Sequence, residues 1–381
     1  MILPPGFKHV VVDISAHGFG HLAQTAAVIN ELKLDENNVK LTVRSMADEA
    51  TLRERIRHES FDLIKCPLDN GMVMYDALRV DADKTMEWYN DFHGNYASRV
   101  SDAARELEAL EPDLLFSNVP YLGLDALAAA TELVQVPSVA LCSLNWADIF
   151  LSYCGEYPGA KKIHDEILGA YSQADVFLQP TPSMPMHLLS NTHSVAPIAL
   201  KGISQPEILR SLIGIQDDIV NTKFVLIGVG GVGIKGFPLN TWPRIPNVYW
   251  IFPDAVLDSS SVVRRHDFVG QSHFDRHMRY IDLLASCSLV ITKTGYGTQT
   301  EAVVNQVPSI CIERLDWPEH VNLRDWHETH GEVVFMDWAD IRKTRRFEAV
   351  VMDMLGKEDW PKTIVDPTGA KEAAAILHQY L

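Results

Sequence analysis

Short apolar runs rich in Val, Ile and Leu recur along the chain, and each precedes a polar or glycine-rich segment and then a helix-like spacing of apolar residues. Such runs occupy residues 9–15, 114–117, 138–142, 223–229 and 289–293. Apolar runs of this length indicate buried strands, because strands covered on both faces need no polar alternation. Strands that alternate with helices predict an α/β protein built on parallel sheets.

The alternation occurs in two halves of the chain, which predicts two doubly wound, Rossmann-like domains. Breaker residues from Lys201 to Pro206 begin the link between them. We place the first domain at residues 1–215 and the second at residues 216–365, with a last helix within residues 366–381. In the first domain, the pattern also predicts one long helix from about Asp83 to Leu110.

Glycine-rich loops follow three of the predicted strands. They contain Gly18 and Gly20, Gly230 and Gly231, and the run Thr294, Gly295, Tyr296, Gly297, Thr298. Small residues let backbone N–H groups approach an anion, and the amino end of the next helix favours negative charge. Such loops in both halves predict a phosphate-bearing ligand in a cleft between the two domains. A capping box that joins Thr298 to Glu301 is the alternative for the third loop.

Two histidines, His17 and His21, flank the first glycine loop. The loop lacks the third glycine of a dinucleotide fingerprint, which disfavours a Rossmann dehydrogenase. A single loop histidine commonly satisfies backbone groups, but a pair at the edge where α/β sheets bind ligands is a candidate for acid–base chemistry. Asp69, Asn145 and Trp146 follow other predicted strands, and we expect them to line the same cleft.

Composition limits the partners of this chain. Its formal net charge is −17 and it has no basic tract, which disfavours nucleic acid as a partner. An anionic nucleotide stays compatible, because backbone dipoles and cations such as Lys293 or Arg314 set the local field. Five cysteines without a C-x-x-C pair, no signal peptide and no run of membrane-spanning length predict a cytoplasmic protein, with a peripheral membrane contact left open.

Two patterns invite a test for metal binding. His273 and His277 lie one helical turn apart, but zinc needs a third ligand and Arg276 adds positive charge between them. Asp81 and Asp83 lie where a helix begins, and carboxylates are favourable there without any metal. We therefore expect no metal and no other bound cofactor.

The second half resembles the donor-binding segment of GT-B glycosyltransferases, most closely the MurG-like branch, at Gly295, Thr298, Glu301, Pro308, Glu319 and His320. The resemblance implies that Thr294, Gly295 and Thr298 contact the donor phosphates and that Glu301 binds the ribose hydroxyls. Glu319 and His320 then bind the donor sugar, although the family often has glutamines at these positions. The further donor-side candidates are Gly18, Gly20, Gly230, Gly231, Tyr296, Gly297 and Arg314.

The first glycine loop also fits this family. Gly20 and His21 resemble the Gly-His pair of its first loop, so His21 would act as a base or as an electrostatic partner, with His17 as the alternative base. Asp69, Asn145 and Trp146 would then lie on the acceptor side.

The resemblance implies transfer of a sugar from a nucleotide-diphosphate sugar, such as a UDP-sugar, to a hydroxyl acceptor, with inversion and without a bound metal. It also implies a last helix that crosses back onto the first domain. Two alternatives stay open, namely a nucleotide-sugar epimerase and a sugar-nucleotide binding protein without catalysis. An epimerase would isomerise the donor sugar with no acceptor present.

A second resemblance concerns residues 17–21, 68–81, 143–150 and 295–297, which look similar to the glycosyltransferase-like half of plant arabinokinases. No glycine-rich ATP loop with a lysine partner follows, so arabinokinase activity is not expected.

Overall fold

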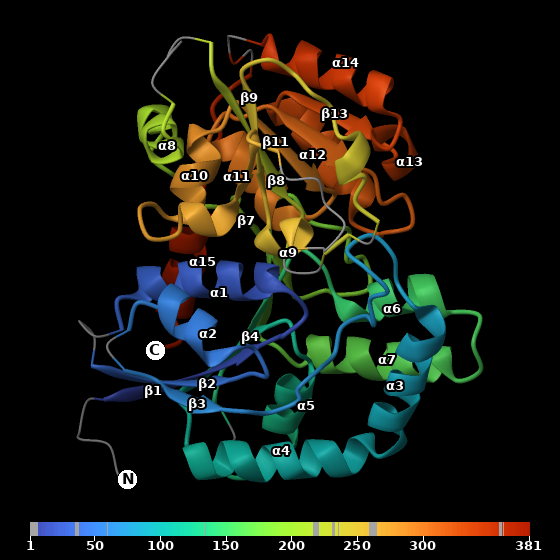
Figure 1. Ribbon diagram of the computed structural model, residues 1–381. Helices are drawn as coiled ribbons and strands as arrows, with labels where there is room; N and C mark the ends of the chain where they lie inside the picture. The colour runs from blue at the N-terminus through green and yellow to red at the C-terminus, as the bar shows by residue number, and fades with distance from the viewer. Residues whose placement is uncertain are drawn as a thin grey trace. The chain divides into compact units, whose positions relative to one another are not determined.

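The computed structural model describes residues 7–34, 38–58, 60–133, 135–215, 221–230, 233–234, 236–258, 265–357, 360 and 362–381 (Figure 1). The predicted ligand residue Gly231 lies outside these residues. The chain forms two compact units: unit 1 comprises Met1–Tyr75, Val80–Ile198 and Thr368–Leu381, and unit 2 comprises Asp76–Arg79 and Ala199–Pro367. The chain enters unit 2 after Ile198, before the boundary predicted at residue 215.

Unit 1 is built on a seven-stranded parallel sheet of the described residues, in the order β3-β2-β1-β4-β5-β6-β7. Its strands are β1 (Lys8–Ile14), β2 (Val39–Arg44), β3 (Asp62–Ile64), β4 (Leu114–Asn118), β5 (Ser138–Leu141), β6 (Val176–Pro180) and β7 (Thr192–Val195). Val12 on β1 pairs with Val43 and Phe116 on the neighbouring strands, and all three are fully buried. The apolar run of β1 therefore reflects burial on both faces of the sheet.

Helices cover both faces of this sheet. They are α1 (Phe19–Leu32), α2 (Glu49–Arg55), α3 (Ala82–Gly94), α4 (Tyr96–Leu110), α5 (Leu122–Ala129), α6 (Trp146–Cys154), α7 (Ala160–Ser172) and α15 (Gly369–Leu377). Although α15 is the last helix of the chain, it packs against α1 and groups with unit 1 (Figure 1). Ala373 and Leu377 are fully buried in the core that contains β1.

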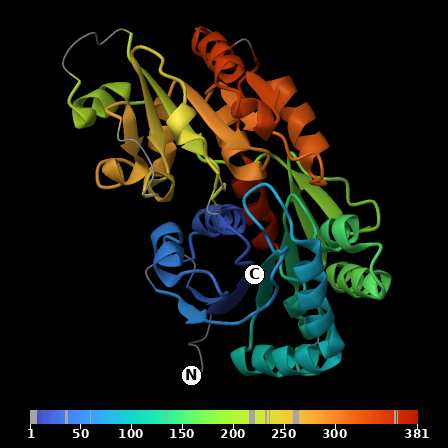
Figure 2. The same ribbon diagram turned by 45° about the vertical axis from the view of Figure 1, so that its right-hand side comes forward.

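The single helix predicted from about Asp83 to Leu110 is wrong. The structure has α3 and α4 instead, and the chain turns sharply between them at Asn95, as both views show (Figures 1 and 2). Gly94 and Asn95 are poor helix formers, so the helix can break there although the helical spacing of apolar residues continues across the break. Asp81 caps α3 by accepting from Lys84 N–H at 3.1 Å, which gives this carboxylate a structural role.

Unit 2 contains a six-stranded parallel sheet of the described residues, in the order β10-β9-β8-β11-β12-β13. Its strands are β8 (Lys223–Gly228), β9 (Val248–Phe252), β10 (Phe268–Gly270), β11 (Leu289–Lys293), β12 (Ser309–Ile312) and β13 (Val333–Met336). The helices are α8 (Pro206–Ile213), η1 (Leu239–Thr241), α9 (Asp254–Leu257), η2 (Gln271–His273), α10 (Tyr280–Ser286), α11 (Tyr296–Val304), α12 (His320–His330), α13 (Trp338–Ile341) and α14 (Thr344–Leu355). The predicted α/β class with two parallel sheets is thus confirmed.

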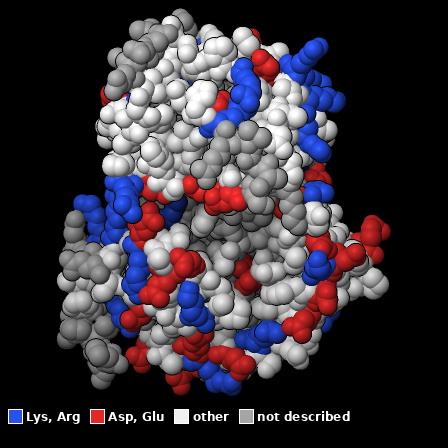
Figure 3. Space-filling view, viewed as in Figure 1, with Lys and Arg blue, Asp and Glu red and all other residues white. Residues whose placement is uncertain are grey.

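Charged side chains of both signs are interspersed over unit 1 on the face that Figure 3 shows, and they do not form one continuous basic surface there. Within the described parts of the chain, no helix has the length and apolarity required to cross a membrane.

A buried ion pair lies inside unit 1. Arg44 donates from Nε and Nη2 to the two carboxylate oxygens of Asp13, each at 2.7 Å, and both side chains are fully buried. Two parallel hydrogen bonds offset much of the cost of removing both charges from water. Gly123 on α5 leaves room for this pair, because a Cβ there would lie 2.0 Å from Asp13 Oδ2.

We expect Gly123→Ala to destabilise the protein by about 3 kcal/mol or more, because the methyl group must displace a buried and paired carboxylate. Chemical denaturation monitored by circular dichroism measures the change. Gly169→Ala on α7 is the matched control, since no atom within 4 Å would meet its Cβ. The control should leave stability unchanged or raise it by about 1 kcal/mol through better helix propensity. Equal stabilities of the two variants would contradict the account.

Candidate functional site

The sheet order reverses at one point in each unit. In unit 1 the chain runs outward from β1 to one side and from β4 to the other, and in unit 2 the same holds for β8 and β11. Helices that follow two such strands cross to opposite faces, so a crevice opens at the carboxyl ends of the pair. Among the predicted ligand residues, His17 and His21 follow β1, Gly230 follows β8, and residues 294–298 follow β11.

His21 lies in the first turn of α1, at the carboxyl ends of β1 and β4, and is 7% exposed. Its Nδ1 is 3.1 Å from Asn118 Oδ1, while Asn118 Nδ2 donates to Gln24 Oε1 at 3.2 Å. Because the amide nitrogen of Asn118 faces an acceptor, its oxygen faces His21 and accepts the Nδ1 proton. This tautomer leaves the Nε2 lone pair of His21 available to take a proton.

Burial lowers the pKa of His21 to about 4, and the hydrogen bond to Asn118 only partly opposes this shift. Asn118 carries no charge, so it orients the imidazole without the electrostatic help that a carboxylate would give. His21 is therefore a neutral imidazole at neutral pH.

The structure brings His17, Trp146 and Asp69 together with His21. The ring centroid of Trp146 lies 4.9 Å from that of His17 and 5.4 Å from that of His21, edge to face in both cases. Trp146 Nε1 donates to Asp69 Oδ2 at 2.8 Å, and Ser15 Oγ donates to Asp69 Oδ1 at 3.0 Å. These contacts hold four of the predicted residues in one fixed cluster.

Gly71 explains how the cluster packs so closely. Its φ of 58° lies in the left-handed region, and a Cβ would come within 2.7 Å of His17 and 2.8 Å of Trp146. Glycine is thus required by both conformation and space, and the chain after Asp69 can pass directly against the two rings.

Asp69 has an unusual titration. Burial raises its pKa to about 7, although the hydrogen bonds from Ser15 and Trp146 favour its charged form. A carboxyl group with this pKa can hold or release a proton near neutral pH, which makes Asp69 a second candidate for proton transfer.

The remaining predicted residues of unit 1 have simpler roles. Asn145 is fully buried and caps α6 by accepting from Asp148 N–H at 2.8 Å, so a structural role accounts for this side chain. Gly18 and Gly20 are exposed beside His21, and Gly18 has a φ of 80° at the N-cap of α1. No side chain caps that helix end.

In unit 2, the predicted phosphate loop leads into α11. The helix begins at Tyr296 with Gly295 as its N-cap, and no side chain caps it. Thr298 therefore lies within the helix, and the capping box considered from the sequence is wrong. The first N–H groups of a helix have no acceptor inside it, so Gly297 and Thr298 present N–H groups at an end with partial positive charge.

Two amides before the helix already have acceptors. Thr294 N–H donates to the Ile312 carbonyl at 2.9 Å, and Gly295 N–H donates to Gln299 Oε1 at 2.8 Å. Gln299 Nε2 in turn lies 3.1 Å from Nδ1 of the fully buried His327. Gln299 thus ties the loop to α12, which sequence reasoning missed because glutamine carries no motif at this position.

The polar pair predicted to bind the donor sugar is buried beside this loop. His320 Nδ1 lies 3.2 Å from Thr294 Oγ1, and the Thr294 hydroxyl donates to the Ile312 carbonyl at 3.1 Å. Thr294 is fully buried, so it orients His320, and its contact with a phosphate stays a prediction. Glu319 accepts from Trp317 Nε1 at 2.8 Å.

Arg314 lies in the same loop after β12, 5% exposed, with its guanidinium 4.1 Å from the Trp317 ring centroid. Gly230, which follows β8, has a φ of 86°, and a Cβ there would lie 3.8 Å from Cε of Lys293. The loops after β8, β11 and β12 therefore meet at one place. Glu301 is partly exposed one turn into α11.

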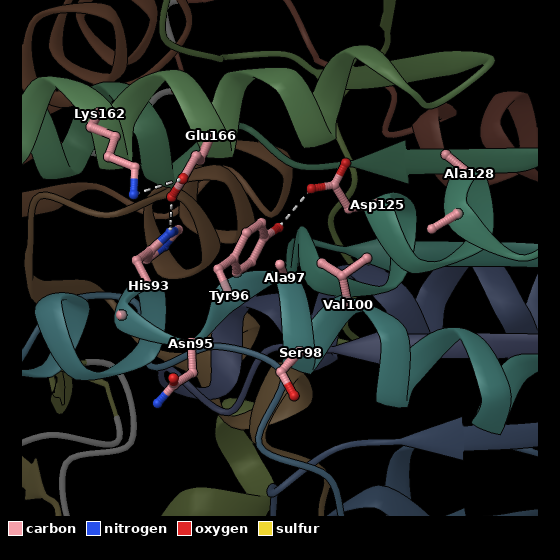
Figure 4. A pocket seen from close by; sticks show the side chains of 12 residues that line it. His93, Asn95, Tyr96, Ala97, Ser98, Val100, Asp125, Ala128, Lys162 and Glu166 are labelled. Carbon is pink, nitrogen blue, oxygen red and sulfur yellow. Dashed lines mark hydrogen bonds and ion pairs between the residues drawn. The ribbon is translucent and has the colours of Figure 1, made fainter.

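A separate pocket of about 720 Å³ lies in unit 1 among α3, α4, α5 and α7 (Figure 4). Four of its polar side chains form two pairs: His93 Nδ1 lies 2.8 Å from Glu166, and Tyr96 donates to Asp125 at 3.0 Å. None of the residues predicted to bind ligand lines it. Among the described residues, no three or more His, Cys, Asp or Glu side chains converge as metal ligands.

This architecture is similar to that of several proteins of known structure. No family model matches the chain. The chain is 13% identical to two solved structures that match nearly all of it. One is Arabidopsis thaliana UGT89C1 complexed with UDP, with a TM-score of 0.60 over 98% of this chain and 99% of that one. The other is Acinetobacter baumannii MurG, with a TM-score of 0.55 over 98% of this chain and 99% of that one. The UDP-GlcNAc 2-epimerase of Methanocaldococcus jannaschii is also similar, with a TM-score of 0.55 and 11% identity over 98% of this chain and 99% of that one.

The chain has the GT-B fold. The resemblance inferred from short motifs is thus confirmed at the level of the fold. In sequence, the GT-B chain is 22% identical over 329 residues to the L-arabinokinase of Arabidopsis thaliana, a match that covers 84% of this chain. It spans only 30% of the length of that kinase.

We expect Asn118→Asp to raise the pKa of His21 by about 1 to 3, because a carboxylate at hydrogen-bond distance stabilises the imidazolium. The ring signals of His21 in ¹H–¹⁵N NMR spectra follow the titration directly. Asn118→Ala removes the acceptor and should not produce this rise. A titration of His21 that is unchanged in Asn118→Asp would mean that Asn118 does not set its proton affinity.

We expect Gln299→Ala to lower the free energy of unfolding by about 1–3 kcal/mol, because it leaves the partly buried Gly295 N–H and the buried His327 Nδ1 without these partners. Denaturant titration measures the loss. Gln173→Ala, at an exposed glutamine at the end of α7, should change stability by less than about 0.5 kcal/mol. Similar losses in both variants would argue against a bridging role for Gln299.

Proposed function

We propose that this protein is a glycosyltransferase that moves a sugar from a nucleotide-diphosphate sugar to a hydroxyl group of an acceptor. The observation that carries the proposal is the uncapped amino end of α11, which lies at the point of strand-order reversal in a GT-B fold. Such a helix end is suited to a diphosphate because it combines unpaired N–H groups with partial positive charge. UGT89C1, which shares the fold, was solved with UDP.

On the donor side, the amides of Gly297 and Thr298 would bind the diphosphate and Glu301 the ribose hydroxyls. Glu319 and His320 would then contact the sugar. These groups would also stabilise the diphosphate as it leaves, so that no bound metal is required. The nucleotide sugar is a co-substrate in this scheme, and no resident cofactor takes part.

In unit 1, His21 would accept the proton of the attacking hydroxyl group through Nε2. The acceptor oxygen then bonds to the anomeric carbon while the bond from that carbon to the diphosphate breaks, which inverts the configuration. Trp146 and Asp69 would hold the acceptor, and His17 is the alternative base. We place the reaction in the cytoplasm, as the scattered cysteines suggest.

A nucleotide-sugar epimerase is the second candidate, because the M. jannaschii epimerase has a similar structure. The two reactions differ in whether an acceptor is needed. Incubation of a nucleotide sugar with the protein alone, followed by ¹H NMR of the anomeric signal, separates them: an epimerase converts the sugar without any acceptor, and a transferase does not.

The proposal is tested first by donor binding. Thermal unfolding is measured with UDP-glucose, dTDP-glucose, GDP-mannose and ADP-glucose, since a ligand that binds the native state raises the midpoint. A panel of hydroxyl acceptors then reports transfer with the donor that binds. If no nucleotide sugar shifts the midpoint, the proposal fails. If a donor binds but neither transfer nor epimerisation follows, the protein is a sugar-nucleotide binding protein.

We expect His21→Ala to lower kcat by about 10²–10⁴-fold with little change in donor affinity, because only the proton transfer is lost. His193→Ala, at an exposed position on β7, is the matched control and should keep full activity. Initial rates and donor binding by calorimetry give the two quantities.

The pH profile identifies the base. With His21 as the base, the acidic limb of kcat/KM should fall as the pH drops toward 4, since the imidazole must be neutral to act. An acidic limb that begins to fall near pH 7 as the pH is lowered would instead assign the proton transfer to Asp69. A His21→Ala variant with unchanged kcat would remove His21 from the mechanism.

A further inference from the structure

The pocket among α3, α4, α5 and α7 has no part in the proposed transfer reaction. It forms at the sharp turn between α3 and α4, because neither helix fills the space beside Asn95. The small side chains of Ala128 and Ala129, at the end of α5, line another part of the pocket. Its volume of about 720 Å³ falls within the range of small-molecule sites, about 300–1,000 Å³.

Two carboxylates flank an aromatic ring in this pocket. Figure 4 shows the ring of Tyr96 between Glu166 and Asp125. The Tyr96 hydroxyl donates to Asp125 Oδ2 at 3.0 Å, and no Lys or Arg of the described residues forms an ion pair with Asp125. Burial raises the pKa of Asp125, the hydrogen bond from Tyr96 only partly opposes this rise, and repulsion by Glu166 adds to it. The charge of Asp125 is thus poorly compensated within the chain.

Glu166 has two partners, but only one of them is a cation at neutral pH. Its Oε2 lies 2.8 Å from His93 Nδ1, which must donate because a carboxylate can only accept. His93 Nε2 lies 2.8 Å from the hydroxyl of the fully buried Tyr121 and accepts from it when the ring is neutral. Burial lowers the pKa of His93, so the ring is neutral at neutral pH. The cation is Lys162, 3.4 Å from Glu166 Oε1.

The lining of the pocket therefore carries an excess of negative charge. Lys162 is 75% exposed, and an exposed ion pair compensates a carboxylate only weakly. Beside the two carboxylates, the rings of His93 and Tyr96 are nearly parallel, with centroids 4.7 Å apart. Aromatic rings and carboxylates both attract cations, so the pocket disfavours anions such as nucleotide sugars.

We propose that this pocket binds a small organic amine in its ammonium form, with Asp125 as the main partner and Glu166 as the second. An ammonium group has three N–H donors and no acceptor, so it can bond to carboxylate oxygens that are left open to the pocket. The ring of Tyr96 would add a cation–π contact. The inference does not rest on the proposed function, because none of the residues that carry the transfer line this pocket.

The test is isothermal titration calorimetry with three four-carbon compounds of similar length, namely putrescine, 1,4-butanediol and succinate. They are doubly positive, neutral and doubly negative at pH 7. We expect putrescine alone to bind, with an affinity that falls as the ionic strength is raised. In ¹H–¹⁵N NMR spectra, the ring signals of His93 should shift as putrescine is added, which locates the bound amine.

Three variants assign the binding to individual charges. Asp125→Asn keeps an oxygen for the Tyr96 hydroxyl but removes the charge, and should raise the Kd for putrescine about tenfold or more. Lys162→Met removes the competing cation at an exposed position and should lower this Kd by about two- to fivefold. Glu132→Gln removes an exposed carboxylate shortly after α5 and should leave the Kd unchanged. Circular dichroism confirms that each variant is folded.

A fourth variant excludes the other candidate carboxylate of unit 1. Asp69→Asn should retain putrescine binding, since Asp69 lies in the cluster with His21 and not in this pocket. Loss of binding in that variant would place the amine beside His21 and overturn the inference. It is also overturned if putrescine does not bind, if succinate binds equally well, or if Asp125→Asn and Lys162→Met both keep the wild-type Kd.

Discussion

Strand order is the constraint on which both candidate sites depend. In each unit, a pair of adjacent parallel strands, β1 with β4 and β8 with β11, leads to helices on opposite faces of the sheet. Backbone N–H groups and side chains at the carboxyl ends of such a pair are left uncovered by helices. His21 and the amino end of α11 lie at these two places, so the chemistry of each unit follows from its topology.

Buried polar side chains then fix the shape of each site. Asn118 holds one tautomer of His21, and Gln299 ties Gly295 to His327. A buried polar group without a partner is costly, so each of these hydrogen bonds restricts the loop that carries it. The lack of charge on Asn118 matters as much as its geometry, because burial then leaves His21 with a lowered pKa that a carboxylate in the same place would have raised.

Much of the fold could be predicted from the chain because buried parallel strands leave a strong local signal. The runs that became β1, β4, β5, β8 and β11 were found from their apolar residues alone. The break at Asn95 was missed, since the apolar spacing continues through it and only weak helix propensity marks it. The capping box failed for a related reason: spacing places Thr298 and Glu301 correctly, but the position of the helix start decides what they do.

The sequence by itself determined which residue types follow the central strands, including both histidines of the first loop and the glycines before α11, because these lie next to runs that can only be strands. Only the tertiary structure decided their partners. Asn118 lies 97 residues from His21, and Gln299 lies 28 residues from His327. Hydrogen bonds between such remote residues leave no periodic signal in a single chain. Proton affinities were likewise out of reach, since they depend on how much water packing removes around each group.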